Sequence, residues 1–137
     1  MIENLFTSTS IPVAEQVAHF AQARHQVLAG NLANIDTPGY RTRDLSVTQF
    51  QQRLKQAIVE QQQSPQPESE SSRTHASSRP MEKVKEGIGT ILHHDDSNVG
   101  VEHQVTEIAK NQMQHNLAMT IMGNQFRLLQ AAISERA

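Results

Sequence analysis

The chain has 137 residues, a length typical of one domain, but its composition is poor for a compact one, with 4% aromatic residues and no tryptophan. The net charge is −2 and no basic cluster is present, which argues against nucleic acid and anionic membranes as primary partners. Cysteine is absent, which fits a protein that works in an oxidising compartment without disulfides.

The chain carries no segment typical of a secretory signal peptide and no apolar stretch long enough to cross a membrane. Taken alone, this pattern predicts a cytoplasmic protein.

Residues 1–12 are polar and rich in Ser and Thr, and we expect them to be a flexible N-terminal segment. Ser10, Pro12 and Glu15 then favour the start of a helix that runs from about 12 to 34. Its apolar residues recur at helical spacing and predict one buried stripe; they are Val13, Ala14, Val17, Ala21, Leu28, Leu32 and Ile35.

A sharp turn is predicted where this helix ends, in the sequence Asp36-Thr37-Pro38-Gly39. Proline disfavours helical geometry at the residue before it, and glycine accepts the positive φ of a type II turn. The chain should therefore leave the helix at Tyr40 in a defined direction.

The middle of the chain contributes a shorter helix and then little apolar material. Residues 44–60 read as the helix, and residues 61–98 as a flexible or exposed linker that is rich in Gln, Ser and Pro in its first half. Within residues 81–99, helical spacing is interrupted by Gly87 and Gly89, so a short strand is an equal alternative there. We expect this region to be the least ordered or the most exposed part of the chain.

Residues 99–137 predict one long helix with a heptad pattern, whose apolar face needs a partner. The N-terminal helix is the only comparable partner in the chain. The sequence thus predicts a mostly α fold in which long N- and C-terminal helices pair as a coiled coil. We call the C-terminal heptad positions the C-terminal seam; they are Val101, Val105, Ile108, Gln112, His115, Met119, Met122, Phe126, Leu129 and Ile133.

Two segments together resemble a known family, the flagellar axial proteins. The first is Asn31-x-x-Asn34-x-Asp36-Thr37-Pro38-Gly39-Tyr40 at the end of the first helix, and the second is the C-terminal seam. Within that family, Arg41-Thr42-Arg43-Asp44 after the turn looks most like the basal-body rod proteins, and among these the proximal rod subunit. The resemblance covers about 13–54 and 98–134.

The resemblance implies a structural subunit that is exported unfolded by the flagellar type III apparatus and folds on assembly in the periplasm. It implies several partners: copies of the chain itself, other rod subunits, the basal-body membrane (MS) ring with its rod adaptor protein, and the export gate. It implies that the turn residues Asn31, Asn34 and 36–40 and the helix seams make the contacts of assembly. No cofactor and no small-molecule substrate are implied.

Phe50 and Leu54, one helical turn apart, also resemble the short element with which such subunits dock on the export gate. An ordinary packing pair on one helix face is an equal alternative.

No constellation favours an enzyme. The chain lacks a cysteine nucleophile, a Gly-x-Ser-x-Gly motif and a phosphate-binding glycine loop. His93, His94, Asp95 and Asp96 are the only cluster resembling metal ligands, and a solvated polar loop is the better interpretation. The alternative function is a soluble coiled-coil adaptor or chaperone, which explains the seam but leaves the Asp-Thr-Pro-Gly-Tyr exit unexplained.

Overall fold

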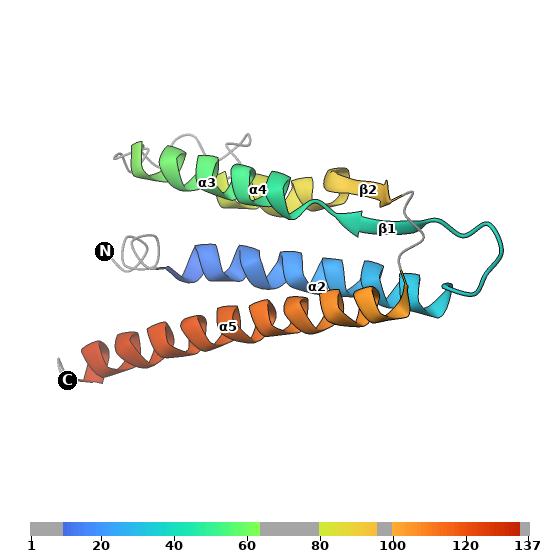
Figure 1. Cartoon of the computed structure of the whole chain (residues 1–137). Helices are drawn as coiled ribbons and strands as arrows, with labels where there is room; N and C mark the ends of the chain where they lie inside the picture. Colours follow the sequence, from blue (N-terminus) through green and yellow to red (C-terminus); the bar gives the residue numbers. More distant parts are fainter. Residues whose placement is uncertain (1–9, 64–79, 96–99, 135–137) are drawn as a thin grey trace.

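A computed structural model describes residues 10–63, 80–95 and 100–134 of the chain. The long helices are α2 (Ile11–Ala33) and α5 (Val101–Ser134), and α3 (Val47–Gln63) is the third. The short elements are α4 (Pro80–Glu86), the 3-10 helix η2 (Gly87–Ile91) and two strands, β1 (Thr42–Leu45) and β2 (Leu92–Asp95). In Figure 1, α2 lies between α5 on one side and α3 with α4 on the other.

The predicted pairing of the two terminal helices is confirmed. Helix α5 runs antiparallel to α2, because Asn31 near the end of α2 meets Gln104, whereas Ala21 meets Asn111 further along α5. Small residues allow the close approach: Ala14 and Ala21 are buried on α2, and Ala118 is buried on α5. This contact is the most extensive between any two elements (Figure 1).

The face that α5 turns toward α2 differs from the predicted seam. Three residues spaced seven apart are buried there: Gln104, Asn111 and Ala118. Alternate members of the C-terminal seam flank them and are partly buried, namely Ile108, His115, Met122 and Leu129. The remaining members are exposed, namely Val101, Val105, Gln112, Met119, Phe126 and Ile133.

Polar contacts explain why this mixed face is the one that pairs. The Asn111 side chain donates a hydrogen bond of 2.7 Å to the Ala21 carbonyl, so a polar residue is accommodated between closely packed helices. A buried, hydrogen-bonded amide fixes the register of a helix pair at some expense of stability. Within the chain, therefore, only alternate members of the C-terminal seam contribute to packing against α2.

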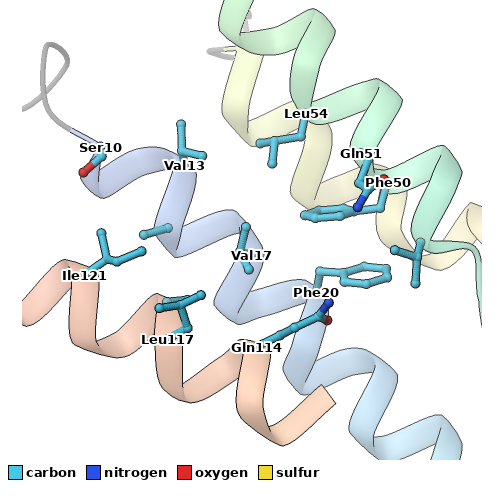
Figure 2. Close-up of a pocket in the computed structure, with 13 residues that line it drawn as sticks. Ser10, Val13, Val17, Phe20, Phe50, Gln51, Leu54, Gln114, Leu117 and Ile121 are labelled. Atoms are coloured by element: carbon cyan, nitrogen blue, oxygen red, sulfur yellow. The ribbon is translucent and has the colours of Figure 1, made fainter. Parts of the chain in front are cut away.

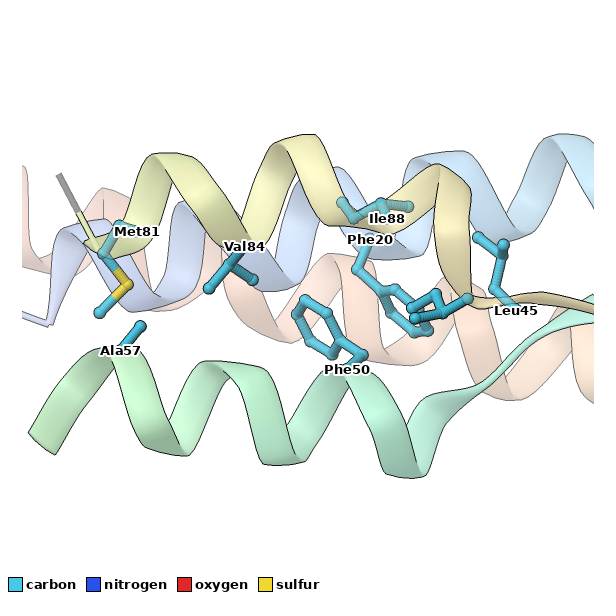
Figure 3. Close-up of a cluster of buried hydrophobic side chains, with 8 residues drawn as sticks. Phe20, Leu45, Phe50, Ala57, Met81, Val84 and Ile88 are labelled. Atoms are coloured by element: carbon cyan, nitrogen blue, oxygen red, sulfur yellow. The ribbon is translucent and has the colours of Figure 1, made fainter. Parts of the chain in front are cut away.

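A second core lies on the opposite side of α2, between α2, α3 and α4. Figure 3 shows Phe20 of α2 against Phe50 of α3, and the two rings are stacked with centroids 4.1 Å apart. Helix α4 closes the core with its apolar face, which includes Met81 and Val84. The buried members of the core are Phe20, Leu45, Phe50, Ala57, Met81, Val84, Ile88 and Ile91.

This core corrects the prediction of a flexible or exposed segment at residues 61–63 and 80–95. Helix α3 continues to Gln63, and residues 80–95 form α4, η2 and β2. The apolar residues at positions 81, 84, 88 and 91 are all buried, so their spacing outweighs the interrupting glycines. Residues 64–79 lie outside the described part of the chain.

The strands were only partly anticipated. Strand β1 was missed, and β2 pairs with it antiparallel, with Thr42 opposite Asp95 and Leu45 opposite Leu92. The 87–92 segment, for which helix and strand were left open, is a 3-10 helix that passes into β2. None of the helices in the described part of the chain is long and apolar enough to cross a membrane.

Candidate assembly site

The turn after α2 has the geometry that its sequence predicts. The Tyr40 amide donates a hydrogen bond of 3.1 Å to the Thr37 carbonyl, and Gly39 between them has φ of +76°. This is a type II turn with Pro38 and Gly39 at its centre. Residues 36–39 are all exposed, so the tip of the turn is open to solvent.

Asn31 holds the two sides of this turn together. Its side chain is completely buried and acts on β1 as a backbone would: Nδ2 donates to the Arg43 carbonyl at 2.6 Å, and Oδ1 accepts from the Arg43 amide at 3.0 Å. The Tyr40 hydroxyl also donates to Oδ1, at 3.1 Å. The first asparagine and the tyrosine of the motif therefore fix the direction in which the chain leaves α2.

Asn34 closes the end of the helix. Its side-chain nitrogen donates to the Gly30 carbonyl at 2.8 Å, and its backbone amide is shared between the carbonyls of Gly30 and Asn31. These contacts satisfy carbonyls that a helix end would otherwise leave without partners. The Asn-x-x-Asn spacing thus has a local structural cause.

An ion-pair network next to Asn31 joins α2, β1 and α5. The buried Arg24 guanidinium donates two hydrogen bonds to Asp44, Nε to Oδ1 at 2.8 Å and Nη2 to Oδ2 at 2.6 Å. Its Nη2 also donates to Oε2 of Glu107 at 2.9 Å, while Lys110 pairs with Oε1 of Glu107 at 2.7 Å. Such paired, charge-assisted bonds are stronger than neutral ones.

These contacts shift the protonation of Glu107. The hydrogen bond from Lys110, followed by that from Arg24, holds the pKa of Glu107 below its usual value, because both donors stabilise the carboxylate. The carboxylate therefore stays charged at neutral pH and keeps α5 tied to α2.

Sequence reasoning found some of these residues and missed others. Asn31, Asn34 and Tyr40 were selected from the motif, and the structure brings them together. Asp44 and Glu107 were not selected as site residues, since partners 20 and 83 positions from Arg24 cannot be read from local spacing. A charged residue within an otherwise apolar stripe, as Arg24 is, was the available indication that such partners exist.

The predicted helix seams are divided between buried and exposed positions. On α2, Ala21 and Leu28 are buried, and Val17 and Leu32 are partly buried. On α5, Ile108, Met122 and Leu129 are partly buried, while the exposed seam members include Val105, Met119, Phe126 and Ile133. The exposed fraction of Phe126 is 52% and that of Ile133 is 70%, so one side of α5 presents large apolar side chains to solvent.

Phe50 and Leu54 lie on the face of α3 that turns toward α2 (Figure 2). Phe50 is buried against Phe20, and Leu54 packs on the edge of the same core. The packing role that was left open for this pair is therefore present in the folded chain, and the export role stays a prediction.

The structure does not test a metal site at the histidine cluster. The side chains of His93, His94 and Asp95, and all of Asp96, lie outside the part that the structure describes. Among residues 10–63, 80–95 and 100–134, no three His, Cys, Asp or Glu side chains are grouped so that they could hold a metal ion.

The curated proteins similar to this chain are flagellar basal body rod proteins. The chain is 25% identical over 122 residues to the flagellar basal body rod protein FlgB of Salmonella typhimurium, a match covering 82% of this chain and 84% of the relative. The FlgB of Aquifex aeolicus is 27% identical over 119 residues, which cover 87% and 88% of the two chains. The FlgB of Borrelia hermsii is 24% identical over 143 residues, which cover 95% and 98%.

These matches support a FlgB-type family assignment for the chain. No family model matches it, and no solved structure matches it. The resemblance carried by the turn motif and the C-terminal heptads is thus confirmed at the level of the family. FlgB-type relatives support a structural role in the basal-body rod for this chain.

Proposed function

We propose that the chain is a structural subunit of the proximal rod, built into the flagellar basal body on the periplasmic side of the inner membrane. The observation that carries this proposal is the exposed part of the C-terminal seam on α5. A helix with a long apolar stripe in water needs a partner, and α2 occupies only the adjacent face. Rod neighbours, both copies of this chain and other rod subunits, would cover the stripe.

The tip of the turn is the second surface that the proposal uses. Asn31, Arg24 and Asp44 hold the chain so that the exposed residues 36–39 project from one end of the helix pair (Figure 1). A rigid projection at the end of a rod-shaped subunit suits a contact with the next layer. We assign this contact to the membrane (MS) ring, its rod adaptor protein or a following rod subunit.

Export in an unfolded state is part of the same proposal. The absence of cysteine removes unwanted disulfides from a chain that unfolds and refolds. Phe50 is 4% exposed in the folded chain, so docking of Phe50 and Leu54 on the export gate would have to precede folding. The same two residues would then serve export first and the core of the assembled subunit afterwards.

The test replaces an exposed seam residue with a charged one in cells that depend on this gene for motility. Phe126→Asp should leave the isolated protein helical and folded, because the side chain is half exposed, and should prevent basal bodies from being completed. Asn124→Asp adds the same charge at an exposed position of α5 without removing an apolar side chain, and should be tolerated. Normal numbers of basal bodies and normal swimming with Phe126→Asp would contradict the proposal.

The alternative, a soluble coiled-coil adaptor or chaperone, uses the same exposed stripe for a different purpose. It differs in where the protein is found: a tagged rod subunit co-purifies with basal bodies, whereas an adaptor stays in the soluble fraction when the rod is intact.

A further inference from the structure

The C-terminal end of α5 extends beyond the helix with which it pairs. Helix α2 begins at Ile11, and its first turns lie beside Ala118 and Ile121. Residues 123–134 continue in the same direction past this point, and Figure 1 shows α5 running past the start of α2. We call residues 123–134 the overhang; at 1.5 Å per residue it is about 18 Å long.

The overhang is apolar and nearly uncharged. Phe126, Leu128 and Ile133 are exposed to 52%, 63% and 70%, respectively. Arg127 is its only charged residue. Its apolar side chains recur at spacings that place most of them on one broad face of the helix.

A groove of matching character lies directly beside the base of the overhang. It has a volume of about 350 Å³ and is walled by α2, α3 and α5 (Figure 2). None of the thirteen residues that line it carries a charge, and most are apolar, as Val13, Leu54 and Leu117 illustrate. Along α2 it reaches from Ser10 to Phe20, which is about 15 Å of helix.

The overhang cannot fill the groove of its own chain. Gln114, Leu117 and Ile121 of α5 form one wall of that groove, and α5 is a continuous helix from Val101 to Ser134. Residues 123–134 therefore lead away from the wall that residues 114–121 build. The overhang of another copy meets no such restriction.

We propose that the overhang of one copy lies in the groove of a second copy of this chain. The length of the overhang matches that of the groove, both surfaces are apolar, and neither presents a charge that would be left without a partner, since Arg127 can point to solvent at the rim. The contact deepens the proposed rod function, on which it rests, by naming the surfaces through which like subunits meet.

The two surfaces differ from each other, so the contact is heterologous. Such contacts close into a ring when the rotation allows, and otherwise continue as an open helical array. A single short helix in a groove is small beside the roughly 1,200–2,000 Å² of a stable interface. Association should therefore be weak in dilute solution and strengthen when many copies are held together.

Engineered cysteines test the contact directly, because the natural chain has none. Val13→Cys in the groove and Phe126→Cys in the overhang are purified as separate full-length proteins, mixed and oxidised. We expect a disulfide-linked heterodimer whose yield rises with protein concentration. Met113→Cys is the matched control, since Met113 is an exposed apolar residue of α5 outside both surfaces, and it should give several-fold less product with Val13→Cys.

A second measurement does not depend on disulfide geometry. Leu117→Asp places a charge in the groove at a residue that is 60% exposed, so the chain should still fold, and it should weaken self-association in sedimentation by roughly tenfold. Met113→Asp should leave self-association unchanged. Equal effects of the two substitutions would overturn the proposal.

Other occupants of the groove give different results. If a Phe6→Cys, Val13→Cys double variant instead forms an intramolecular disulfide at a rate independent of concentration, the groove holds the chain's own N-terminal segment and the proposal is wrong. Equal yields from the Met113→Cys control would also overturn it. These experiments use purified protein, so failure of the contact is distinguishable from failure of the rod function, which is measured on basal bodies in cells.

Discussion

Asn31 is the residue on which the geometry of the turn depends. Its side chain has no exposed area and makes hydrogen bonds to both backbone groups of Arg43 and to the Tyr40 hydroxyl. A buried backbone group that loses its partner is expensive, because it gives up hydration without a replacement. One amide side chain therefore stabilises the start of β1 and the direction of the exit from α2.

Truncation of Asn31 should cost much more stability than removal of the Tyr40 hydroxyl. Asn31→Ala leaves the Arg43 amide and carbonyl without their partners, at about 1–3 kcal/mol for each group. Tyr40→Phe removes one hydrogen bond and should cost about 0.5–1.5 kcal/mol. Urea unfolding followed by circular dichroism measures both, and similar losses in the two variants would show that Asn31 does not organise the turn.

Two glycines in this region should respond to alanine with opposite signs. Gly39 has φ of +76°, a conformation that costs a residue with a Cβ atom about 1–2 kcal/mol, so Gly39→Ala should destabilise the chain. Gly30 lies inside α2 with open space around the position of a Cβ atom, so Gly30→Ala should stabilise it by about 0.5–1 kcal/mol.

The same unfolding experiment compares the two glycine variants. A Gly39→Ala protein as stable as the natural one would mean that the turn gives up its type II geometry at no cost. The turn would then only connect α2 to β1 and would not fix the direction of the chain.

Helix α2 takes part in both packing interfaces of the structure, the pairing with α5 and the core formed with α3 and α4. One of its faces meets α5 through Ala14, Ala21 and Leu28, and another meets α3 and α4 through Phe20. Arg24 lies between these faces and connects β1 to α5 through Asp44 and Glu107. Elements that lie far apart in the sequence are therefore joined by one buried guanidinium.

The link between Arg24 and Glu107 should make stability depend on pH in the acid range. The pKa of Glu107 is lowered in the folded chain by the hydrogen bond from Lys110 and then by Arg24, so the folded state binds this proton less readily than the unfolded state. Its contribution is fully present above the ordinary glutamate pKa of about 4.3 and is lost as pH falls through the lower, folded pKa.

Glu107→Gln isolates this contribution. The variant should be less stable than the natural chain at pH 7, and its stability should fall less steeply between about pH 5 and pH 2, because position 107 no longer takes up a proton. Thermal melts across this range provide the measurement. An unchanged slope would show that Glu107 does not contribute to the acid sensitivity, and Glu102→Gln, an exposed glutamate on the same helix, serves as control.

The whole molecule is a layered arrangement with an unequal distribution of contacts. Residues in the middle of α2 have neighbours on two sides, whereas the overhang of α5 has large apolar side chains in solvent (Figure 1). Local opening is easiest where few buried contacts must be broken. Stability should therefore decline along α5 from the Gln104–Ala118 region toward Ser134.

Hydrogen exchange on the dilute protein should show this gradient. Amides near Phe20 and Leu28 in α2 should exchange most slowly, those near Asn111 in α5 at intermediate rates, and those of residues 123–134 fastest. Raising the protein concentration should slow exchange selectively in residues 123–134 if neighbouring copies cover them. Uniform protection along α5 in dilute solution would contradict this distribution.

The sequence by itself determined the elements whose causes are local. Periodicity gave the two long helices and their pairing, and Pro38 with Gly39 gave the type II turn, because proline and glycine restrict φ wherever they occur. The turn motif also indicated the FlgB-type resemblance that the curated relatives support. Within the motif, the spacing of Asn31 and Asn34 reflects a helix end that lies within a few residues of both.

Only the tertiary structure decided which faces meet. The C-terminal heptads of α5 allow more than one apolar face, and Asn111 and Ala118 were selected because small or hydrogen-bonded residues let two helices approach closely, a property that depends on α2. The burial of residues 81–91 likewise required Phe20 and Phe50, which come from distant parts of the chain. Asp44 and Glu107 became partners of Arg24 only because folding brought β1 and α5 to the same side of α2.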